Sequence, residues 1–313
     1  MTHDHDTAHE DEHDHEHEHG PLAELVTVRD WLRYAVTRFN RAGCFYGHGL
    51  QDAYDEAVYL ILHTLALPLD RLEPFLDACI PGDEREDILE VIEKRAVDRL
   101  PAAYITGEAW LGEFRFEVDK RVIIPRSYFA ELLHDGFSPW VQDPDAITAA
   151  MDMCTGSGCL AILMAFAFPN AEIVAVDISQ DALDVAAANI AAYGLEDRIR
   201  LVKSDGFAQV PEQRFDFILS NPPYVTRESM ESLPAEYLHE PGLALGSGED
   251  GLDLVRKLLA DAPRYLTPEG LLAIEVGHNR EIVEEAFPTL SPTWLSAPSG
   301  DDKIFILEAG QLL

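Results

Sequence analysis

The sequence predicts an α/β fold with an open sheet, preceded by a small helical domain. Two observations indicate this architecture. Apolar strand-like runs alternate with helical segments from residue 149 to the C-terminus, whereas residues 21–100 show helical periodicity. The chain has 313 residues, which is long enough for two domains that each bury a core. We expect a helical, substrate-recognising domain at 21–100, a linker at 101–127 and an α/β domain at 128–313.

Three segments of the helical domain carry apolar residues at helical spacing: Leu25–Val36, Ala53–His63 and the charged Asp83–Arg99. Pro101 stops the last of these helices. The pattern then changes to alternating apolar and polar residues over Trp110–Val118, and a second short run follows at Arg121–Pro125 after a turn near Asp119. We interpret these two runs as a β-hairpin that links the domains.

A βαβ unit opens the α/β domain. A short strand from Ala149 enters a turn that contains Gly156 and Gly158, an apolar helix follows, and the next strand ends at Asp177. Glycines in this turn let a ligand approach the backbone. An acidic residue nineteen positions after Gly158 is well placed to bind ribose hydroxyls.

The glycine turn also satisfies the degenerate G-x-G-x-x-A pattern of dinucleotide-binding proteins, so a hydride-transfer enzyme competes at this point. The order of the later strands decides against it. The strand from Arg198 to Lys203 ends at Asp205, where a carboxylate can reach an adenine amino group. Carboxylates at successive strand ends, followed by an amide-binding motif, predict a site for S-adenosylmethionine.

That motif is Asn221-Pro222-Pro223-Tyr224, which follows the apolar run 215–220. The two prolines fix φ and lack N–H donors, and the first restricts Asn221 to an extended conformation. The Asn221 side-chain oxygen and the Pro222 carbonyl can both accept hydrogen bonds from one planar NH₂ group, while Tyr224 supplies a flat face. We call Asn221 to Tyr224 the ledge, and we predict that Asn221, Pro222 and Tyr224 are catalytic.

The remaining segments complete the sheet. We expect a helix at Asp250–Leu266, a buried strand at Gly270–Gly277 and a helix at His278–Phe287. The last two strands, Trp294–Ala297 and Lys303–Glu308, resemble the antiparallel pair that ends many class I methyltransferases. The predicted fold is therefore a Rossmann-like, class I S-adenosylmethionine-dependent methyltransferase domain with an N-terminal helical domain.

The chain is strongly acidic, with a formal net charge of -34. Eight of its 57 acidic residues, and none of its 23 basic ones, lie in residues 1–20, which leaves -26 for the rest. We interpret residues 1–20, which also hold seven histidines, as a disordered tail without a selective metal site. The acidic remainder repels phosphate backbones and attracts basic proteins, although a host with high internal salt would favour the same composition.

Four cysteines form no C-x-x-C pair, and no secretory signal or long apolar run is present, so we expect a cytoplasmic protein with reduced thiols.

With these residues assembled, the sequence resembles the protein N5-glutamine methyltransferases, and within them the branch that modifies large-subunit ribosomal protein three. The resemblance runs from about Leu22 to the C-terminus. Its most specific segments are Val122–Ser127, Asp152–Gly158, Ser220–Val225, Leu233–Pro241 and Gly246–Gly251. The release-factor branch usually has glycine where Cys154 stands, which favours the ribosomal-protein branch over N5-glutamine methylation of peptide release factors.

The resemblance also implies site roles. Asp177 and Asp205 would hold the ribose and adenine of S-adenosylmethionine, and the glycine loop would lie against its methionine part. The loop residues concerned are Asp152, Thr155, Gly156 and Gly158, with Asn221 beside them. The ledge residues Asn221, Pro222, Pro223 and Tyr224 would bind the substrate amide. The resemblance therefore implies a methyl group transferred to a glutamine side chain of a ribosomal protein. Because the chain is acidic and ribosomal proteins expose basic extensions until RNA covers them, we expect this substrate to be free or in assembly precursors.

Arg126 follows the predicted hairpin, and its positive charge is expected to meet the cofactor's carboxylate or the substrate, unless it forms a structural salt bridge. Two other functions remain open. An adenine-N6 or guanine-N2 methyltransferase uses a similar ledge, but it normally presents a basic track, which is not evident in this sequence. An inactive assembly factor would bind ribosomal protein through its acidic face, and the intact motifs argue against it.

Overall fold

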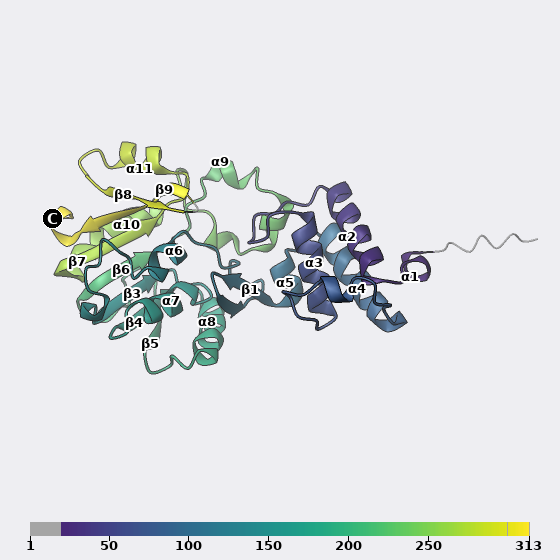
Figure 1. Cartoon of the computed structure of the whole chain (residues 1–313). Helices are drawn as coiled ribbons and strands as arrows, with labels where there is room; N and C mark the ends of the chain where they lie inside the picture. Colours follow the sequence, from purple (N-terminus) through teal and green to yellow (C-terminus); the bar gives the residue numbers. More distant parts are fainter. Residues whose placement is uncertain (1–19, 299, 313) are drawn as a thin grey trace, which may run out of the picture.

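The computed structural model describes residues 20–298 and 300–312 and places a helical part beside a sheet-containing part (Figure 1). The predicted tail at residues 1–20 lies outside the described residues except for Gly20. The helical part contains α1 (Pro21–Glu24), α2 (Val28–Ala42), α3 (Ala53–Thr64), α4 (Gly82–Ala96) and α5 (Ala102–Thr106). Its core is built on Trp31, Phe39, Leu60, Ile88 and Ile92. No helix of the described residues is long and apolar enough to cross a membrane.

Helix α2 shows why the sequence forms these elements. Thr27 caps it in a reciprocal arrangement, in which the Thr27 hydroxyl accepts from the Asp30 N–H and the Asp30 carboxylate accepts from the Thr27 N–H at 2.9 Å. Gly43 ends the helix at φ 64°, a left-handed conformation that costs glycine little. Apolar residues every three or four positions then bury one face of the helix against α3 and α4.

The sheet has seven strands in the order β5-β4-β3-β6-β7-β9-β8. The first five are parallel, and β9 is antiparallel to both β7 and β8. Their bounds are β3 (Ala149–Met153), β4 (Glu172–Asp177), β5 (Ile199–Lys203), β6 (Phe215–Ser220), β7 (Leu266–Glu275), β8 (Thr293–Ala297) and β9 (Gly300–Glu308). The strand order reverses between β3 and β6. In open α/β sheets ligands bind at such a point, outside the carboxyl ends of the strands.

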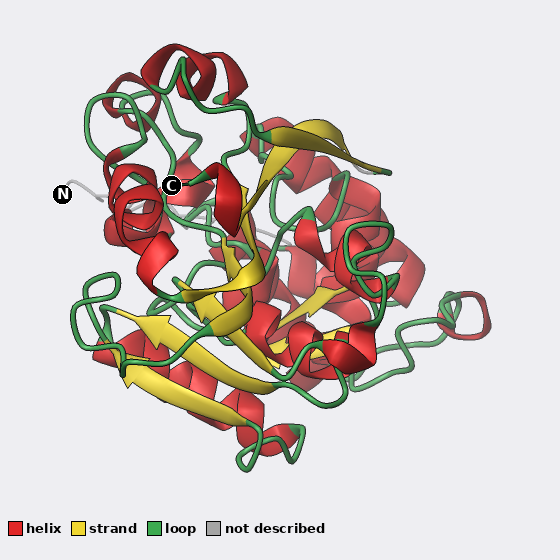
Figure 2. Cartoon of the chain, turned by 90° about the vertical axis from the view of Figure 1, so that its left-hand side faces the viewer, coloured by secondary structure: helices red, strands yellow, loops and turns green. Residues whose placement is uncertain are grey.

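Helices cover both faces of this sheet (Figure 2). One face packs against α6 (Phe129–His134), α7 (Cys159–Ala167) and α8 (Gln180–Ala192). The other packs against α10 (Asp253–Asp261) and α11 (Arg280–Ala286), while α9 (Arg227–Met230) lies in the segment that follows the ledge. Short 3₁₀ helices are η1 (Glu73–Phe75), η2 (Pro144–Ala146), η3 (Ala235–His239), η4 (Gly242–Ala244), η5 (Ala262–Arg264) and η6 (Ala309–Gln311). The predicted class I methyltransferase architecture is confirmed.

Two predicted elements are wrong in their extent. The hairpin forms around the first of its two predicted runs: β1 (Glu108–Leu111) begins two residues before Trp110, β2 (Phe114–Glu117) lies inside the run, and Leu111 pairs with Phe114. Gly112, at φ 61°, allows this tight turn, and Arg121–Pro125 forms no strand. The helix predicted to reach Leu266 ends at Asp261, because the chain tightens into the 3₁₀ turn η5, which contains a proline, and Leu266 already begins β7.

Candidate active site

The glycine loop between β3 and α7 has one open glycine and one packed glycine. A Cβ atom added to Gly156 would meet nothing within 4 Å, whereas one on Gly158 would lie 3.1 Å from the Cβ of Ala186 in α8. Both glycines have positive φ, at 55° and 80°. Gly156 therefore lets a ligand approach the backbone, and Gly158 lets helices α7 and α8 pack closely.

Asp152, the last residue but one of β3, has a buried acceptor atom without a partner. Its Oδ2 accepts a hydrogen bond from the Thr155 hydroxyl at 2.6 Å, but Oδ1 has no hydrogen-bond partner among the described residues. Burial raises the pKa of this carboxyl to about 7, against the opposing effect of Thr155. A buried polar atom is normally satisfied, so Asp152 fits a ligand that brings a hydrogen-bond donor or a positive charge. The ammonium group of S-adenosylmethionine provides both.

The two strand-end carboxylates lie at the same edge of the sheet, because Asp177 pairs with Lys203 across β4 and β5 and Asp205 follows two residues later. Asp177 accepts from the Gly156 N–H and the Ser179 N–H, each at 2.9 Å, and burial raises its pKa. Asp205 is exposed, and its carboxylate lies 3.1 Å from Nζ of Lys257. A carboxylate has about four acceptor positions, so both retain the capacity to bind ligand hydroxyl or amino groups.

The ledge begins directly after β6. Ser220 fixes this strand end by donating its hydroxyl to the Met153 carbonyl at 2.8 Å. The Asn221 Nδ2 atom lies 3.5 Å from the Arg126 carbonyl, at the outer limit of a hydrogen bond. This orientation turns the Asn221 amide nitrogen toward the linker and leaves its oxygen for another donor, which is what the binding of a substrate amide requires.

Tyr224 is held by two segments that lie far from it in the sequence. The Asn279 side chain donates to the Tyr224 carbonyl at 2.6 Å. A Cβ atom on Gly251 would approach the same carbonyl to under 3.0 Å, and one on Gly277 would approach the Tyr224 ring equally closely. Both glycines also have positive φ. Only glycine fits at these two positions, and together with Asn279 they fix the tyrosine that ends the ledge.

Glu275 is a buried carboxyl beside the ledge. It ends β7, and its neighbour Ile274 pairs with Ser220 just before the ledge. Oε2 accepts from the Ser127 hydroxyl at 2.5 Å and from the Tyr128 N–H at 3.1 Å. Burial raises its pKa to about 7, although these hydrogen bonds oppose the rise. Glu275 was not among the site residues predicted from the sequence, even though a charged residue inside an apolar strand is a recognisable signal.

A cleft of about 1280 Å³ runs past the ledge. Its lining includes the ledge residues Asn221, Pro222 and Tyr224 together with Glu275. It also includes Phe45, Gly47 and Gly49 from the loop after α2, and we call this loop, residues 45–49, the helical-domain wall of the cleft. The described residues thus bring together the ledge, one end of the sheet and the helical part around one cavity, which is larger than the roughly 300–1,000 Å³ of a typical small-molecule pocket.

Arg126 lines the cleft, but its guanidinium forms an ion pair with Glu240. The guanidinium binds both Glu240 oxygens, at 2.5 and 2.6 Å, and Glu240 also accepts from the Ile124 N–H at 2.9 Å. Burial opposes ionisation of Glu240, but the adjacent His48 and Arg126 outweigh it and lower the pKa to about 2. The structural salt bridge, one of the two roles considered for Arg126, is thus present, and contact with cofactor or substrate stays a prediction.

The described residues contain no group of three or more His, Cys, Asp or Glu side chains that could hold a metal ion. The histidine-rich residues 1–19 lie outside the described part. All four cysteines are free thiols.

Comparisons with known proteins agree with this geometry. A family model described as methyltransferase small domain matches residues 141–290. The ribosomal protein uL3 glutamine methyltransferase of Neisseria meningitidis serogroup B is 57% identical over 290 residues, which cover 93% of this chain and 95% of that protein. The enzymes of the same name from Bordetella pertussis and Bradyrhizobium diazoefficiens are 55% and 44% identical, each over 92% of this chain and over 97% and 92% of their own lengths.

Identity at this level over nearly the whole chain establishes the family, and the methyl donor follows from it. The orphaned Asp152 oxygen and the open Gly156 fit S-adenosylmethionine at the carboxyl edge of the sheet. This chain therefore belongs to the family of ribosomal protein uL3 glutamine methyltransferases and is a class I methyltransferase that uses S-adenosylmethionine.

Proposed function

We propose that this protein transfers a methyl group to the side-chain amide nitrogen (N5) of a glutamine in large-subunit ribosomal protein three, uL3. The observation that carries the proposal is the ledge, because Asn221, Pro222 and Tyr224 all line the cleft directly after the carboxyl end of β6. The names of relatives at 44–57% identity support the same substrate.

The chemistry requires an acceptor ledge because a carboxamide nitrogen is a poor nucleophile. S-adenosylmethionine supplies an electrophilic methyl group when bound. The Asn221 oxygen and the Pro222 carbonyl then accept hydrogen bonds from the two amide N–H groups, which orients the nitrogen and stabilises the positive charge that grows on it. The Tyr224 face packs against the amide plane. The nitrogen loses its proton after the methyl group has been transferred.

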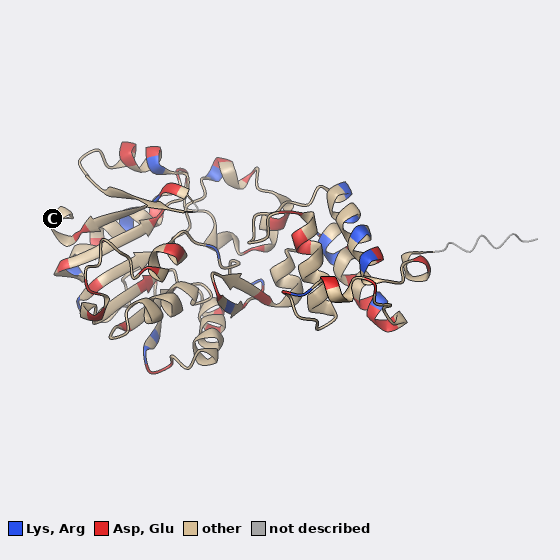
Figure 3. Ribbon diagram, viewed as in Figure 1, with Lys and Arg blue, Asp and Glu red and all other residues tan. Residues whose placement is uncertain are grey.

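The acidic composition supports a basic protein partner. Acidic side chains are spread over both parts of the molecule (Figure 3), and the residues after position 20 carry a formal charge of -26. Ribosomal proteins expose basic extensions until RNA covers them, so we propose that the substrate is free uL3 or uL3 in assembly precursors, and that methylation takes place in the cytoplasm. Electrostatic attraction should speed association at low salt.

Methylation of a nucleic acid is the second candidate function. Its strongest support is a row of arginines on α2: Arg29, Arg33, Arg38 and Arg41. Arg29 pairs with Asp77 and Arg38 with Glu93, so half of this charge is already compensated. An acidic protein with two compensated arginines in the row is a poor phosphate binder, and a protein substrate is the better proposal. Methylation of release factors uses the same chemistry, and the names of the relatives speak against it.

A direct comparison of substrates tests the proposal. We would measure incorporation of labelled methyl groups into isolated uL3, large-subunit precursors, mature large subunits, release factors and naked RNA over a salt series. The proposal expects the highest kcat/KM for isolated uL3 or precursors, with rates that fall as salt rises. Preferential methylation of mature subunits or RNA would overturn it.

A further inference from the structure

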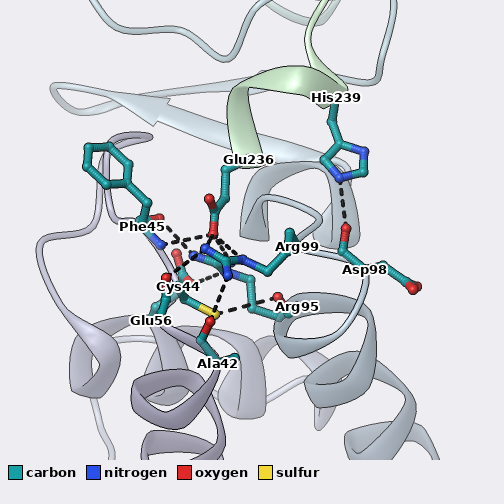
Figure 4. Close-up of polar contacts among 10 residues, drawn as sticks. Ala42, Cys44, Phe45, Glu56, Arg95, Asp98, Arg99, Glu236 and His239 are labelled. Carbon is teal, nitrogen blue, oxygen red and sulfur yellow. Dashed lines mark hydrogen bonds and ion pairs between the residues drawn. The ribbon is translucent and has the colours of Figure 1, made fainter. Parts of the chain in front are cut away.

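A buried ion network joins the segment after the ledge to the helical part (Figure 4). At its centre lies Glu236, which belongs to the 3₁₀ helix η3 and is fully buried. Its Oε1 atom accepts hydrogen bonds from Arg95 Nη1 at 2.9 Å, from Arg99 Nε at 2.8 Å and from the Phe45 N–H at 2.9 Å. All three donors come from the region before the β1–β2 hairpin, so one carboxylate connects parts of the chain about 140 to 190 residues apart.

The arginines of the network are themselves fixed by the helical part. Arg95 is 1% exposed, ion-pairs with Glu56 of α3 and donates to the Phe45 carbonyl at 2.9 Å. Arg99 donates to the Ala42 and Gly43 carbonyls at 2.7 Å each. Burial opposes ionisation of Glu236, but the hydrogen bonds from Arg99, the Phe45 N–H and Arg95 outweigh it and lower its pKa to about 2. Glu236 is therefore charged at every physiological pH.

The network reaches the substrate cleft through Phe45. Gly47 and Gly49, from the same loop as Phe45, line the same cleft as the ledge. Tyr237, the residue after Glu236, also lines the cleft, and its ring centroid lies 4.5 Å from that of His48 in the helical-domain wall. The Arg126 guanidinium lies 5.2 Å from the centroid of the same ring. The network thus holds residues 45–49 and Tyr237 in one wall.

The same segment is anchored to the ledge. The Val225 N–H, immediately after Tyr224, donates to the Leu245 carbonyl at 2.8 Å, and Val225 forms an isolated bridge with Gly246. Chain leaving the ledge at Val225 therefore returns to it at Gly246, and η3 lies in the loop between these two points. A displacement of η3 would move the helical-domain wall relative to the ledge.

We propose that Glu236 is a positioning residue for methyl transfer: by binding Arg95, Arg99 and the Phe45 N–H, it sets the distance between the helical-domain wall and the ledge. This inference deepens the proposed function and rests on it. A protein substrate that contacts both the helical-domain wall and the ledge places its glutamine correctly only when these two surfaces are at the right distance from each other. Misplacement of reacting groups by about 1 Å costs roughly 100-fold in rate, so such a connection has a kinetic consequence.

The matched pair of variants is Glu236→Gln and Glu56→Gln. Both remove one carboxylate from the same Arg95 guanidinium, but Glu56 belongs to the helical part, whereas Glu236 connects this part to the ledge. We expect E236Q to lower kcat/KM on isolated uL3 by about 10-fold or more, with S-adenosylmethionine affinity unchanged. E56Q should lower Tm but keep kcat/KM within about 2-fold.

Amide hydrogen exchange provides a readout that is independent of activity. The Phe45 N–H donates directly to Glu236, so its exchange should accelerate in E236Q and stay protected in E56Q. If E236Q fails to fold, Arg99→Gln replaces it, because Arg99 is partly exposed at the edge of the network, and it should show the same changes to a smaller extent.

Equal activity in E236Q and the parent enzyme, or an equal loss in E236Q and E56Q, would overturn the positioning role. The activity of the parent enzyme on uL3 tests the proposed function separately. A parent that does not methylate uL3 rejects that function, whereas a difference between the two variants is informative only about Glu236.

Discussion

Buried carboxylates on the two sides of the site differ in whether their oxygens already have hydrogen-bond partners in the protein. On the cofactor side, Asp152 has a buried oxygen without a partner and a pKa raised to about 7. On the substrate side, Glu240 binds Arg126 through both of its oxygens, and its pKa is lowered to about 2. The first carboxylate can still accept a hydrogen bond from a ligand. The second already uses both oxygens to hold protein segments together. Buried charge therefore serves binding on one side and geometry on the other.

The largest expected effect tests the substrate side. Asn221→Ala removes an acceptor that acts on the developing charge, so kcat should fall by about 100- to 1000-fold, while the affinity for S-adenosylmethionine stays nearly unchanged. Steady-state kinetics on uL3 and calorimetry with the cofactor measure the two effects. Activity within about twofold of the parent would exclude the amide-holding role.

The pH dependence of stability distinguishes carboxyl groups whose pKa is raised by folding from those whose pKa is lowered. The pKa of Glu275 is about 7 in the folded chain, above its ordinary value of 4.5. The unfolded chain thus loses this proton first, so the stabilisation is complete below pH 4.5 and is lost as pH rises through about 7. The free energy of unfolding should fall by about 3 kcal/mol over this window because of Glu275.

Denaturant titrations at a series of pH values measure this slope, and Glu275→Gln should flatten it. Glu113→Gln, at the exposed turn of the hairpin, is the matched control and should behave as the parent. An unchanged slope in E275Q would mean that the Glu275 carboxyl ionises normally in the folded chain.

A smaller effect is expected within the cofactor side. Asp177→Ala should weaken S-adenosylmethionine binding by about 10- to 100-fold, as for loss of a charged hydrogen-bond acceptor. Asp205→Ala should cost less, because Asp205 is exposed and paired with Lys257. Calorimetry measures the affinity of each variant for S-adenosylmethionine. An unchanged affinity in D177A would show that Asp177 does not bind the cofactor.

The smallest effect concerns residues 1–20. They contain no motif residue and no apolar anchor, so their deletion should leave kcat/KM within about twofold at moderate salt. Weak binding of Ni²⁺ or Zn²⁺ should be lost with them. A large drop in activity would show that these residues contact the substrate or the enzyme.

The sequence was informative where one local pattern determines local structure. Gly156 and Gly158, with an acid at the next strand end, predicted the βαβ unit, and the two prolines predicted the ledge. The register of the hairpin was not predictable by the same reasoning, because the turn at Gly112 and the one near Asp119 both fit an alternating pattern and tertiary packing selects between them.

The contacts that support the ledge were also beyond sequence reasoning. Glu236 lies in a segment whose motif was recognised, but its partners Phe45, Arg95 and Arg99 are 137 or more residues away. Gly277 and Asn279 likewise reach Tyr224 only after β6 and β7 pair. Such contacts depend on the assembled fold, and spacing along the chain does not encode them.

The most direct test of this account is fragmentation mass spectrometry of uL3 after incubation with the parent enzyme and with the N221A variant. Isolated uL3 from cells that lack this activity is the substrate. We predict one added methyl group on the side chain of a glutamine with the parent enzyme, and almost none with N221A. A methyl group on any other residue type, or equal modification by both enzymes, would contradict the assignment of the ledge as a glutamine-amide site.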